Sequence, residues 1–217
     1  MMEAIAVNRP FSGISWKTYL IAAGTLGTLA LYILAWAYPT FPGDEGALVK
    51  FQAIRSGWLD DTAIWFSNLG LLWVFVPAVS VLIGCLVVAR RYADVFMVFG
   101  GLTVIGIGHG LKILVDRPRP DYYLVDALPH GLSFPSGHTL LAVMLGGALF
   151  YLVGLSVRPV WLRRAIQAGL FVLVIGMGAS RVYLGVHWPS DVIGSYVLGV
   201  MALVGLICVR NAVATAR

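Results

Sequence analysis

The sequence predicts an all-α integral membrane protein, a bundle of six transmembrane helices that forms one domain over residues 1–217. Hydrophobic residues make up 59% of the chain and charged residues only 12%, and the mean hydropathy is +0.88. A typical soluble domain carries about 25% charged residues, so this composition excludes one. A membrane-spanning helix needs roughly 20 predominantly apolar residues, and the chain contains six such stretches. Little of the chain is left for a soluble domain.

The six apolar stretches define the expected helices. They run over about 17–38, 70–89, 93–115, 136–156, 164–184 and 190–210. The first stretch is too long for a cleavable signal peptide and has no small-residue cleavage pattern behind it. We therefore expect it to remain in the protein as the first helix.

The segment between the first two stretches, residues 39–69, is too polar to cross a membrane. Its apolar residues recur at helical spacing, which predicts one or two short helices lying on the membrane surface. These apolar residues are Ala47, Val49, Phe51, Ile54, Trp58, Ile64, Trp65 and Leu69. An ordered loop packed on the bundle is an equal alternative, and either structure would shape an entrance for a lipid.

Basic residues predict the orientation, because short loops rich in lysine and arginine stay in the cytoplasm. In a six-helix topology, nine of them fall on one side: Arg9, Lys17, Arg90, Arg91, Arg158, Arg163, Arg164, Arg210 and Arg217. We therefore expect a multi-pass plasma membrane protein with both termini in the cytoplasm. The connections 39–69, 116–135 and 184–190 would then face outward. Tryptophans near the expected helix ends suit interfacial anchors: Trp16, Trp36, Trp73, Trp161 and Trp188.

The net charge of +5 follows from this topology. No basic stripe with interleaved aromatic residues accompanies it, so the charge does not indicate nucleic-acid binding. Cys85 and Cys208 lie inside expected helices, without CxxC spacing or a neighbouring histidine. They are expected to be buried apolar thiols, and the sequence predicts neither a disulfide nor a metal site.

Ionisable residues gather in three short segments that this topology places at the same face. They are GLKILVDRPRPD at the end of the third helix, FPSGHTL at the start of the fourth and SRVYLGVHWPSD before the sixth. Ionisable groups near membrane depth are costly and mark functional sites. Four basic side chains would collect at this mouth of the bundle and would suit a doubly charged phosphate. They are Lys112, Arg117, Arg119 and Arg181.

The start of the fourth helix offers backbone donors for the same anion. Ser136 is a natural N-cap, and Gly137 permits close approach of the backbone. The unpaired N–H groups of the first turn would then face an anion. His138 follows in this turn and points at the same place.

The start of the sixth helix predicts a histidine–carboxylate pair. Pro189 suits the first helical position, which lets Asp191 fold back onto the ring of His187. A carboxylate on one imidazole nitrogen fixes the tautomer and leaves the other nitrogen free as a nucleophile or base.

Together the three segments resemble the tripartite signature of the type 2 phosphatidic acid phosphatase superfamily. The matching residues are Lys112, six residues, Arg119-Pro120; then Pro135-Ser136-Gly137-His138; then Ser180-Arg181, five residues, His187, three residues and Asp191. Any one piece is weak, but all three occur in order on a six-helix chain. The resemblance covers residues 112–191 and the helix count.

This resemblance implies a role for each residue of the signature. His187 would attack phosphorus and form a phosphohistidine, Asp191 would orient it, and His138 would protonate the leaving oxygen and later activate water. The phosphoryl oxygens would be held by Lys112, Arg119, Ser136, Gly137 and Arg181. No metal and no other cofactor is required in this scheme.

Other polar residues near the signature have plainer interpretations. The spacing selects Arg119, which leaves Arg117 as a loop or interface residue. His109 lies one turn before Lys112 and is more simply a hydrogen-bonded packing residue than a second layer of the site. His130 is expected to be solvated. Asp116, Asp121 and Asp126 carry no assigned chemistry.

The expected substrate is an amphiphile whose phosphate lies at headgroup level while its tail stays in lipid. Undecaprenyl pyrophosphate comes first, with phosphatidylglycerol phosphate, phosphatidic acid and lipid A phosphate as alternatives, because the signature recognises the phosphate and not the tail. The same residues would also suit a lipid phosphotransferase. An anion transporter would need basic groups through the membrane depth, whereas these collect at one face. A haloperoxidase is less compatible with a membrane-embedded pocket.

Overall fold

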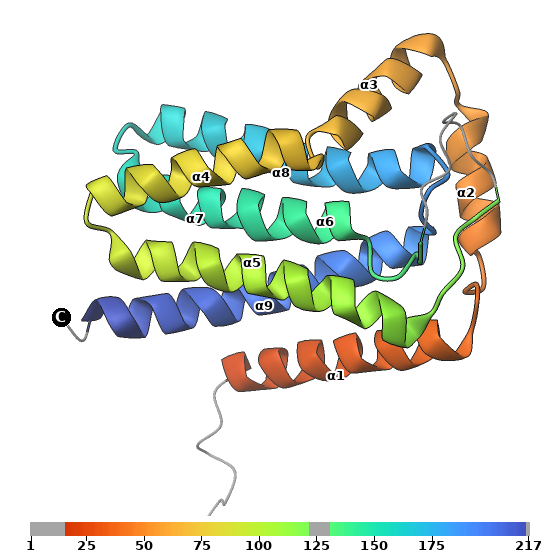
Figure 1. The fold of residues 1–217 in the computed structure, drawn as a ribbon, viewed down its shortest axis with the longest axis horizontal. Helices are drawn as coiled ribbons and strands as arrows, with labels where there is room; N and C mark the ends of the chain where they lie inside the picture. The colour runs from red at the N-terminus through yellow and green to blue at the C-terminus, as the bar shows by residue number, and fades with distance from the viewer. Residues whose placement is uncertain (1–15, 122–130, 216–217) are drawn as a thin grey trace, which may run out of the picture.

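The computed structural model describes residues 16–121 and 131–215, and in this part the chain is all-helical (Figure 1). The helices are α1 (Trp16–Ala37), α2 (Asp44–Ala53), α3 (Gly57–Asn68), α4 (Leu72–Val88), α5 (Tyr92–Val115), α6 (Gly137–Leu141), η1 (Ala142–Gly146), α7 (Gly147–Ser156), α8 (Val160–Tyr183) and α9 (Pro189–Thr215). The predictions on Arg9, Asp126, His130 and Arg217 fall outside the described residues.

Each predicted apolar stretch corresponds to a helix or a continuous helical run. The fourth is the run Gly137–Ser156, in which the π-helical turn η1 separates α6 from α7. Among the described residues, four helices are long and apolar enough to cross a membrane, and a fifth span arises if α3 and α4, bent by 51°, are counted together. In α1 the apolar helix is shorter, Ala22–Ala37. The all-helical membrane fold is confirmed, whereas the count of six spans stays a prediction.

Large apolar side chains cover the outside of the bundle. Val88, Ile113 and Leu72 are 85%, 75% and 73% exposed, as lipid-facing residues of a membrane protein are. Cys85 and Cys208 are exposed as well. The prediction that these thiols are buried is wrong, because much of the apolar surface of these helices faces outward instead of packing in a core.

Tryptophans divide into two groups. Trp36, Trp73 and Trp161 are about 70% exposed or more, as expected of anchors. Trp188 is buried, and its Nε1 donates a hydrogen bond of 3.0 Å to the Pro118 carbonyl. The prediction that Trp188 is an interfacial anchor is therefore wrong, because its indole joins two loops inside the protein.

The segment 39–69 forms the two short helices α2 and α3. Helix α3 packs along α8, and α2 lies across the end of the bundle against α8 and α9 (Figure 1). Tyr183, the last residue of α8, fastens both of them: Gln52 donates to its carbonyl at 3.2 Å, and its hydroxyl donates to Asp60 at 2.5 Å. These helices therefore belong to the packed structure at this end.

The two ends of the bundle differ. The end bearing α2, the start of α6 and the start of α9 is called the site end below, and the end bearing the α4–α5 and α7–α8 turns is called the opposite end (Figure 1). At the opposite end Asp94 is ion-paired with Arg91 and with Arg210 of α9, and Arg91 also donates to Ser156 at 2.6 Å. At the site end Gly108 of α5 lies so close to Leu140 that an added Cβ would be 2.5 Å from its methyl group. This close contact brings α6 against α5.

Candidate active site

The three polar segments of the sequence converge at the site end. Lys112 lies in the last turn of α5, His138 in the first turn of α6, Arg181 in the last turn of α8 and Asp191 in the first turn of α9. The segment after α5 contributes Arg119. Residues that are up to 79 positions apart in the sequence thus surround one place.

A tight turn joins Arg181 to His187. Gly185 has φ 71°, a left-handed conformation that glycine adopts without strain. The Val186 N–H donates to the Arg181 carbonyl, and the Gly185 N–H donates to Val182, which is the Schellman pattern of a helix end. The His187 N–H also donates to the Arg181 carbonyl at 3.2 Å. This turn fixes the five-residue interval between the arginine and the histidine.

His187 and Asp191 form the pair that the sequence predicts. Helix α9 begins at Pro189, so Asp191 lies in its first turn. The Asp191 Oδ2 atom is 3.3 Å from His187 Nδ1 and accepts the Trp188 N–H at 2.9 Å. Both side chains are almost fully buried. The Nε2 atom of His187 consequently points away from the carboxylate and lies 3.4 Å from Arg119 Nη1.

The surroundings of His187 keep its ring neutral. Burial, and then the positive charges of Lys112, Arg119 and Arg181, lower the pKa of His187 well below its usual value of 6.5. A neutral imidazole with Nδ1 directed at a carboxylate has its lone pair on Nε2. The ring is therefore in the form that a nucleophile requires.

The start of α6 is fastened to α9. Ser136 is the N-cap, and its hydroxyl accepts from the Thr139 N–H at 3.5 Å and from the Thr139 hydroxyl at 3.0 Å. This confirms the predicted cap. The Ser136 N–H donates to Ser195, whose hydroxyl donates to the Asp191 carbonyl. Ser136 is fully buried, so a contact with an anion would use its one hydroxyl proton.

Two buried nitrogen atoms at the site have no hydrogen-bond partner among the described residues. They are Nε2 of His138 and Nε of Arg181. The His138 ring packs against Gly70, where an added Cβ would be 2.3 Å away, and Arg181 Nη1 donates to the Ser67 hydroxyl. Buried polar groups in proteins are nearly always paired. These two nitrogen atoms therefore have unused hydrogen-bonding capacity for a bound molecule.

The two remaining predicted cations lie around the same place. Lys112 Nζ donates to the Leu132 carbonyl at 3.0 Å. Arg119 donates from Nε to Gly131 at 2.9 Å and from Nη1 to the Val186 carbonyl at 2.6 Å. Within the described residues, neither Lys112 nor Arg181 forms an ion pair with a carboxylate. The site end thus has an excess of positive charge, which suits an anionic ligand.

Gly137 and His109 are neighbours. The Nδ1 atom of His109 is 3.1 Å from the Ile105 carbonyl one turn earlier, which confirms it as a hydrogen-bonded helix residue. An added Cβ on Gly137 would be 3.2 Å from the His109 ring. The lack of a side chain at Gly137 therefore lets α6 start close to α5.

Sequence reasoning missed two residues at this end. The sequence predicted that Arg117 is only a loop or interface residue. In the structure Arg117 is fully buried and forms ion pairs with both Asp191 and Asp44. Asp44, the first residue of α2, is also buried. The one signal in the sequence is chemical: an arginine in a short loop between apolar segments needs an acidic partner when buried, and Asp44 lies in such a segment.

The described residues contain no group of three or more His, Cys, Asp or Glu side chains placed to hold a metal ion.

Comparison with known proteins identifies a family and several relatives that the chain matches. A family model described as the PAP2 superfamily matches residues 93–214. An undecaprenyl-diphosphatase of Sulfolobus acidocaldarius is 30% identical over 157 residues, covering 70% of this chain and 70% of that protein. A decaprenylphosphoryl-5-phosphoribose phosphatase of Mycobacterium tuberculosis is 36% identical, covering 75% of this chain and 89% of that protein. The crystal structure of a transmembrane PAP2 type phosphatidylglycerolphosphate phosphatase from Bacillus subtilis superimposes with a TM-score of 0.75 and 25% identity, over 88% of this chain and 95% of that one.

Proposed function

The chain belongs to the PAP2 superfamily, and from that membership we propose that it is a membrane phosphatase that hydrolyses lipid phosphates or lipid pyrophosphates. One observation carries the proposal: nitrogens of His138 and Arg181 that have no partner within the described part of the chain lie at the same end of the bundle as a buried His187–Asp191 pair. A phosphoryl group would supply oxygen atoms to those donors and phosphorus to the His187 ring.

The first step is attack of His187 Nε2 on phosphorus. The P–N bond forms as the bond from phosphorus to the leaving oxygen breaks, and that oxygen takes a proton from His138. Asp191 holds Nδ1 and compensates the positive charge that the ring gains. The products of this step are a phosphohistidine and the lipid alcohol, or the lipid monophosphate when the substrate is a pyrophosphate.

The second step is hydrolysis of the phosphohistidine. His138, which has lost its proton, accepts one from water, and the oxygen of that water attacks phosphorus. The P–N bond breaks, inorganic phosphate leaves, and both histidines return to their starting forms.

Cationic side chains stabilise the charge of both transition states. Lys112, Arg119 and Arg181 hold the phosphoryl oxygens, with help from the hydroxyl of Ser136 and the N–H of Gly137. These groups supply the positive charge that magnesium supplies in many other phosphoryl-transfer enzymes. We therefore propose a reaction that needs no metal ion.

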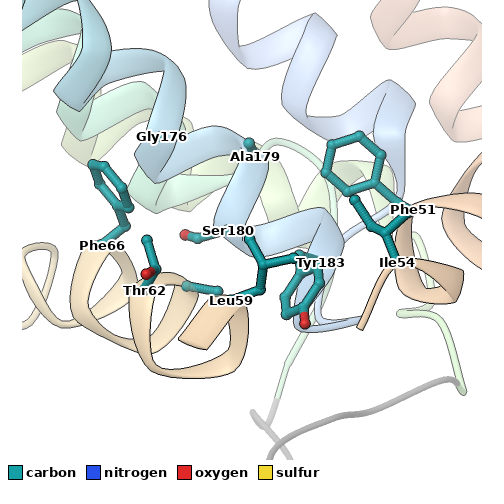
Figure 2. A pocket seen from close by; sticks show the side chains of 10 residues that line it. Phe51, Ile54, Leu59, Thr62, Phe66, Gly176, Ala179, Ser180 and Tyr183 are labelled. Atoms are coloured by element: carbon teal, nitrogen blue, oxygen red, sulfur yellow. The ribbon is translucent and has the colours of Figure 1, made fainter. Parts of the chain in front are cut away.

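An apolar pocket beside the site supports a lipid substrate. It has a volume of about 160 Å³ and lies between α2, α3 and α8; Figure 2 shows Phe66 at one side of it, Phe51 and Ile54 at the other, and Ser180 on the wall between them. The walls formed by α3 and α8 are joined by the hydrogen bond between Ser67, next to Phe66, and Arg181, next to Ser180. A lipid whose phosphate is bound by Arg181 would place the first part of its tail in this pocket.

Related proteins favour a polyprenyl tail. Two of the relatives are named for undecaprenyl and decaprenyl compounds. We propose undecaprenyl pyrophosphate as the first substrate to test, ahead of phosphatidylglycerol phosphate, phosphatidic acid and lipid A phosphate.

The proposed orientation is one six-span domain with both termini in the cytoplasm and the site at the extracytoplasmic face. Arg91 and Arg210 lie together at the opposite end, in agreement with the distribution of basic residues. A Cys85→Ser, Cys208→Ser background tests it. A cysteine at exposed Gly46 should react with an impermeant maleimide in spheroplasts, and one at Val160 should not. Reversed labelling would place the site in the cytoplasm.

The deciding experiment is phosphate release from a panel of lipid phosphates by the purified protein in detergent. Turnover of at least one lipid phosphate, absent from His187→Ala, is expected. Ala179→Phe, which fills the pocket, should raise KM for the long-chain substrate and leave KM for a water-soluble phosphate ester unchanged. If no lipid phosphate were turned over under conditions that keep the protein folded, the proposal would fail.

A further inference from the structure

Arg117 is a fully enclosed charged side chain of the site end. Its side chain is 0% exposed, and it donates four hydrogen bonds. Nε binds the Pro39 carbonyl at 3.0 Å, Nη1 binds Ser190 Oγ at 2.9 Å and Asp191 Oδ1 at 2.6 Å, and Nη2 binds Asp44 Oδ2 at 2.8 Å. The guanidinium group also lies over the ring of Phe41, 4.7 Å from its centroid.

These contacts separate Arg117 from the residues that would bind phosphate. Arg117 has no exposed surface, and the carboxylates of Asp44 and Asp191 compensate its charge. Arg119 and Arg181, by contrast, lie close enough to His187 for their charges to lower its pKa. Arg119 and Arg181 are therefore placed to act on a phosphate bound at His187, whereas Arg117 can act only through its neighbours.

The neighbour that matters is Asp191. Arg117 holds Oδ1, and the Trp188 N–H holds Oδ2. With both oxygens held, the carboxylate has one orientation, in which Oδ2 lies 3.3 Å from His187 Nδ1. Without Arg117 the carboxylate could rotate, and its buried charge would lack compensation.

Asp44 extends this arrangement to α2. Its Oδ1 accepts the Ser190 N–H at 2.9 Å, and its Oδ2 accepts the Ser190 hydroxyl at 2.6 Å in addition to Arg117. The Phe41 N–H binds Oδ2 as well, at 2.9 Å. The first residue of α2 is thereby bonded to the first turn of α9, next to the histidine.

We infer that Arg117 and Asp44 are positioning residues of the active site, which hold Asp191 in the orientation that keeps the proton on His187 Nδ1 and the lone pair on Nε2. The inference rests on the proposed function for its kinetic consequences, but the tautomer of His187 is a property of the protein alone. It also gives the segment 39–69 a role in the chemistry, although that segment carries none of the signature residues.

The charges of the two residues give opposite expectations for the pH profile. The groups that face His187 are Lys112 of α5, Arg119, His138 of α6, Arg181 of α8 and Asp191 of α9. Arg117 and Asp44 lie behind Asp191. Removing the Arg117 charge lets His187 bind a proton more readily, so the acid limb of kcat/KM should move to higher pH. Removing the Asp44 charge should move it to lower pH.

The kinetic test compares Arg117→Met, Arg117→Lys and Asp44→Asn with wild type on a lipid phosphate in detergent. Arg117→Met should lower kcat about 100-fold and leave KM within about twofold, because the ground-state phosphate contacts remain. Arg117→Lys keeps the positive charge but lacks the planar set of N–H donors of the guanidinium group. We therefore expect kcat to fall while the acid limb of the kcat/KM profile stays at the same pH. Asp44→Asn should lower kcat about tenfold.

Arg210→Met is the matched control. It removes an arginine from the ion pair with Asp94 at the opposite end, so it should lower the unfolding temperature and leave kcat and the pH profile unchanged. If the Arg117 and Asp44 variants behaved like this control, losing stability alone, the inference would be overturned.

Nitrogen-15 NMR of histidine-labelled protein tests the inference without any substrate. The chain has four histidines, and the signal of His187 is the one missing from His187→Ala. At neutral pH, wild type should show a neutral ring with the proton on Nδ1, and Arg117→Met should show the other tautomer or a protonated ring. An unchanged His187 signal in folded Arg117→Met and Asp44→Asn would overturn the inference. Failure of wild type to hydrolyse any lipid phosphate would overturn the proposed function and leave this result standing.

Discussion

Both ends of the bundle bury carboxylates paired with arginine, one (Asp94) at the opposite end and two (Asp44 and Asp191) at the site end, and the two arrangements differ in what surrounds them. At the opposite end Asp94 is 1% exposed and is paired with Arg91 and Arg210, whose side chains are 29% and 16% exposed. At the site end Asp191 is paired with Arg117, and both side chains are 0% exposed. The arginines at the opposite end are partly exposed, whereas Arg117 and Asp191 at the site end are completely buried.

The neighbours of each carboxylate explain this difference. At the opposite end the arginines connect α5 to α9, and Arg91 also donates a hydrogen bond to Ser156 of α7. At the site end the described residues offer Lys112 and Arg181 no carboxylate, and they offer Arg181 Nε and His138 Nε2 no hydrogen-bond partner. Such unpaired buried groups destabilise a fold. The comparison indicates that stability is concentrated at one end and binding capacity at the other.

His187→Ala should give the largest effect at the site end. No neighbouring group can replace the attacking nitrogen, so we expect turnover to fall by at least about 10⁴-fold while membrane insertion and thermal unfolding stay close to wild type. Phosphate release and the unfolding temperature are the two measurements. A variant with a near-native rate would refute the phosphohistidine mechanism.

Arg181→Met tests whether the site end exchanges stability for binding. The loss of one phosphate-binding cation should lower kcat/KM by about 10²–10³-fold. The unfolding temperature should change little, because the loss of the hydrogen bond from Nη1 to Ser67 is offset when Nε, which has no partner among the described residues, is replaced by an apolar chain of similar length. A large decrease in unfolding temperature would show that Arg181 is a structural residue.

Asp94→Asn is the reciprocal change at the opposite end. It leaves Arg91 and Arg210 without a carboxylate, and we expect it to lower the free energy of unfolding by about 1–3 kcal/mol, because both arginines keep some contact with water. Turnover per folded molecule should stay within about twofold of wild type. A loss of turnover comparable to that of Arg181→Met would remove the distinction between the ends.

Acid pH should act at the site end through His187. Its pKa is well below 6.5 in the folded protein, so kcat/KM should stay level as the pH falls through 6.5. The unfolded chain binds a proton on this histidine near pH 6.5 and the folded chain does not. Protonation therefore favours unfolding, and stability should decrease as the pH falls below that value. Unfolding temperatures between pH 5 and 8 should show a shallower decrease for His187→Ala than for wild type.

Removal of metal ions should have the smallest effect. Because Lys112, Arg119 and Arg181 are proposed to supply the positive charge around the phosphate, excess EDTA should leave phosphate release unchanged within error. Inhibition by EDTA that magnesium reverses would contradict this assignment.

Hydropathy predicted most of the fold because each apolar stretch is long enough to be recognised by itself. The signature residues were equally accessible, because each piece of the signature lies within one short segment. The Arg117–Asp44 contact was not, because its partners are 73 residues apart and only the packing of α2 across the bundle joins them. Trp188 was misjudged for the same reason: an aromatic residue near a helix end has the same local sequence whether it faces lipid or a loop.

The turn at Gly185 fixes the spacing between Arg181 and Asp191. Two hydrogen bonds from the turn to the Arg181 carbonyl, followed at once by the first turn of α9, leave this stretch no slack. An inserted or deleted residue would turn the imidazole away from the guanidinium group whatever its chemical character. The eleven residues from Arg181 to Asp191 thus form one structural unit, which we expect to keep its geometry in another helical protein only if it is transferred as a whole.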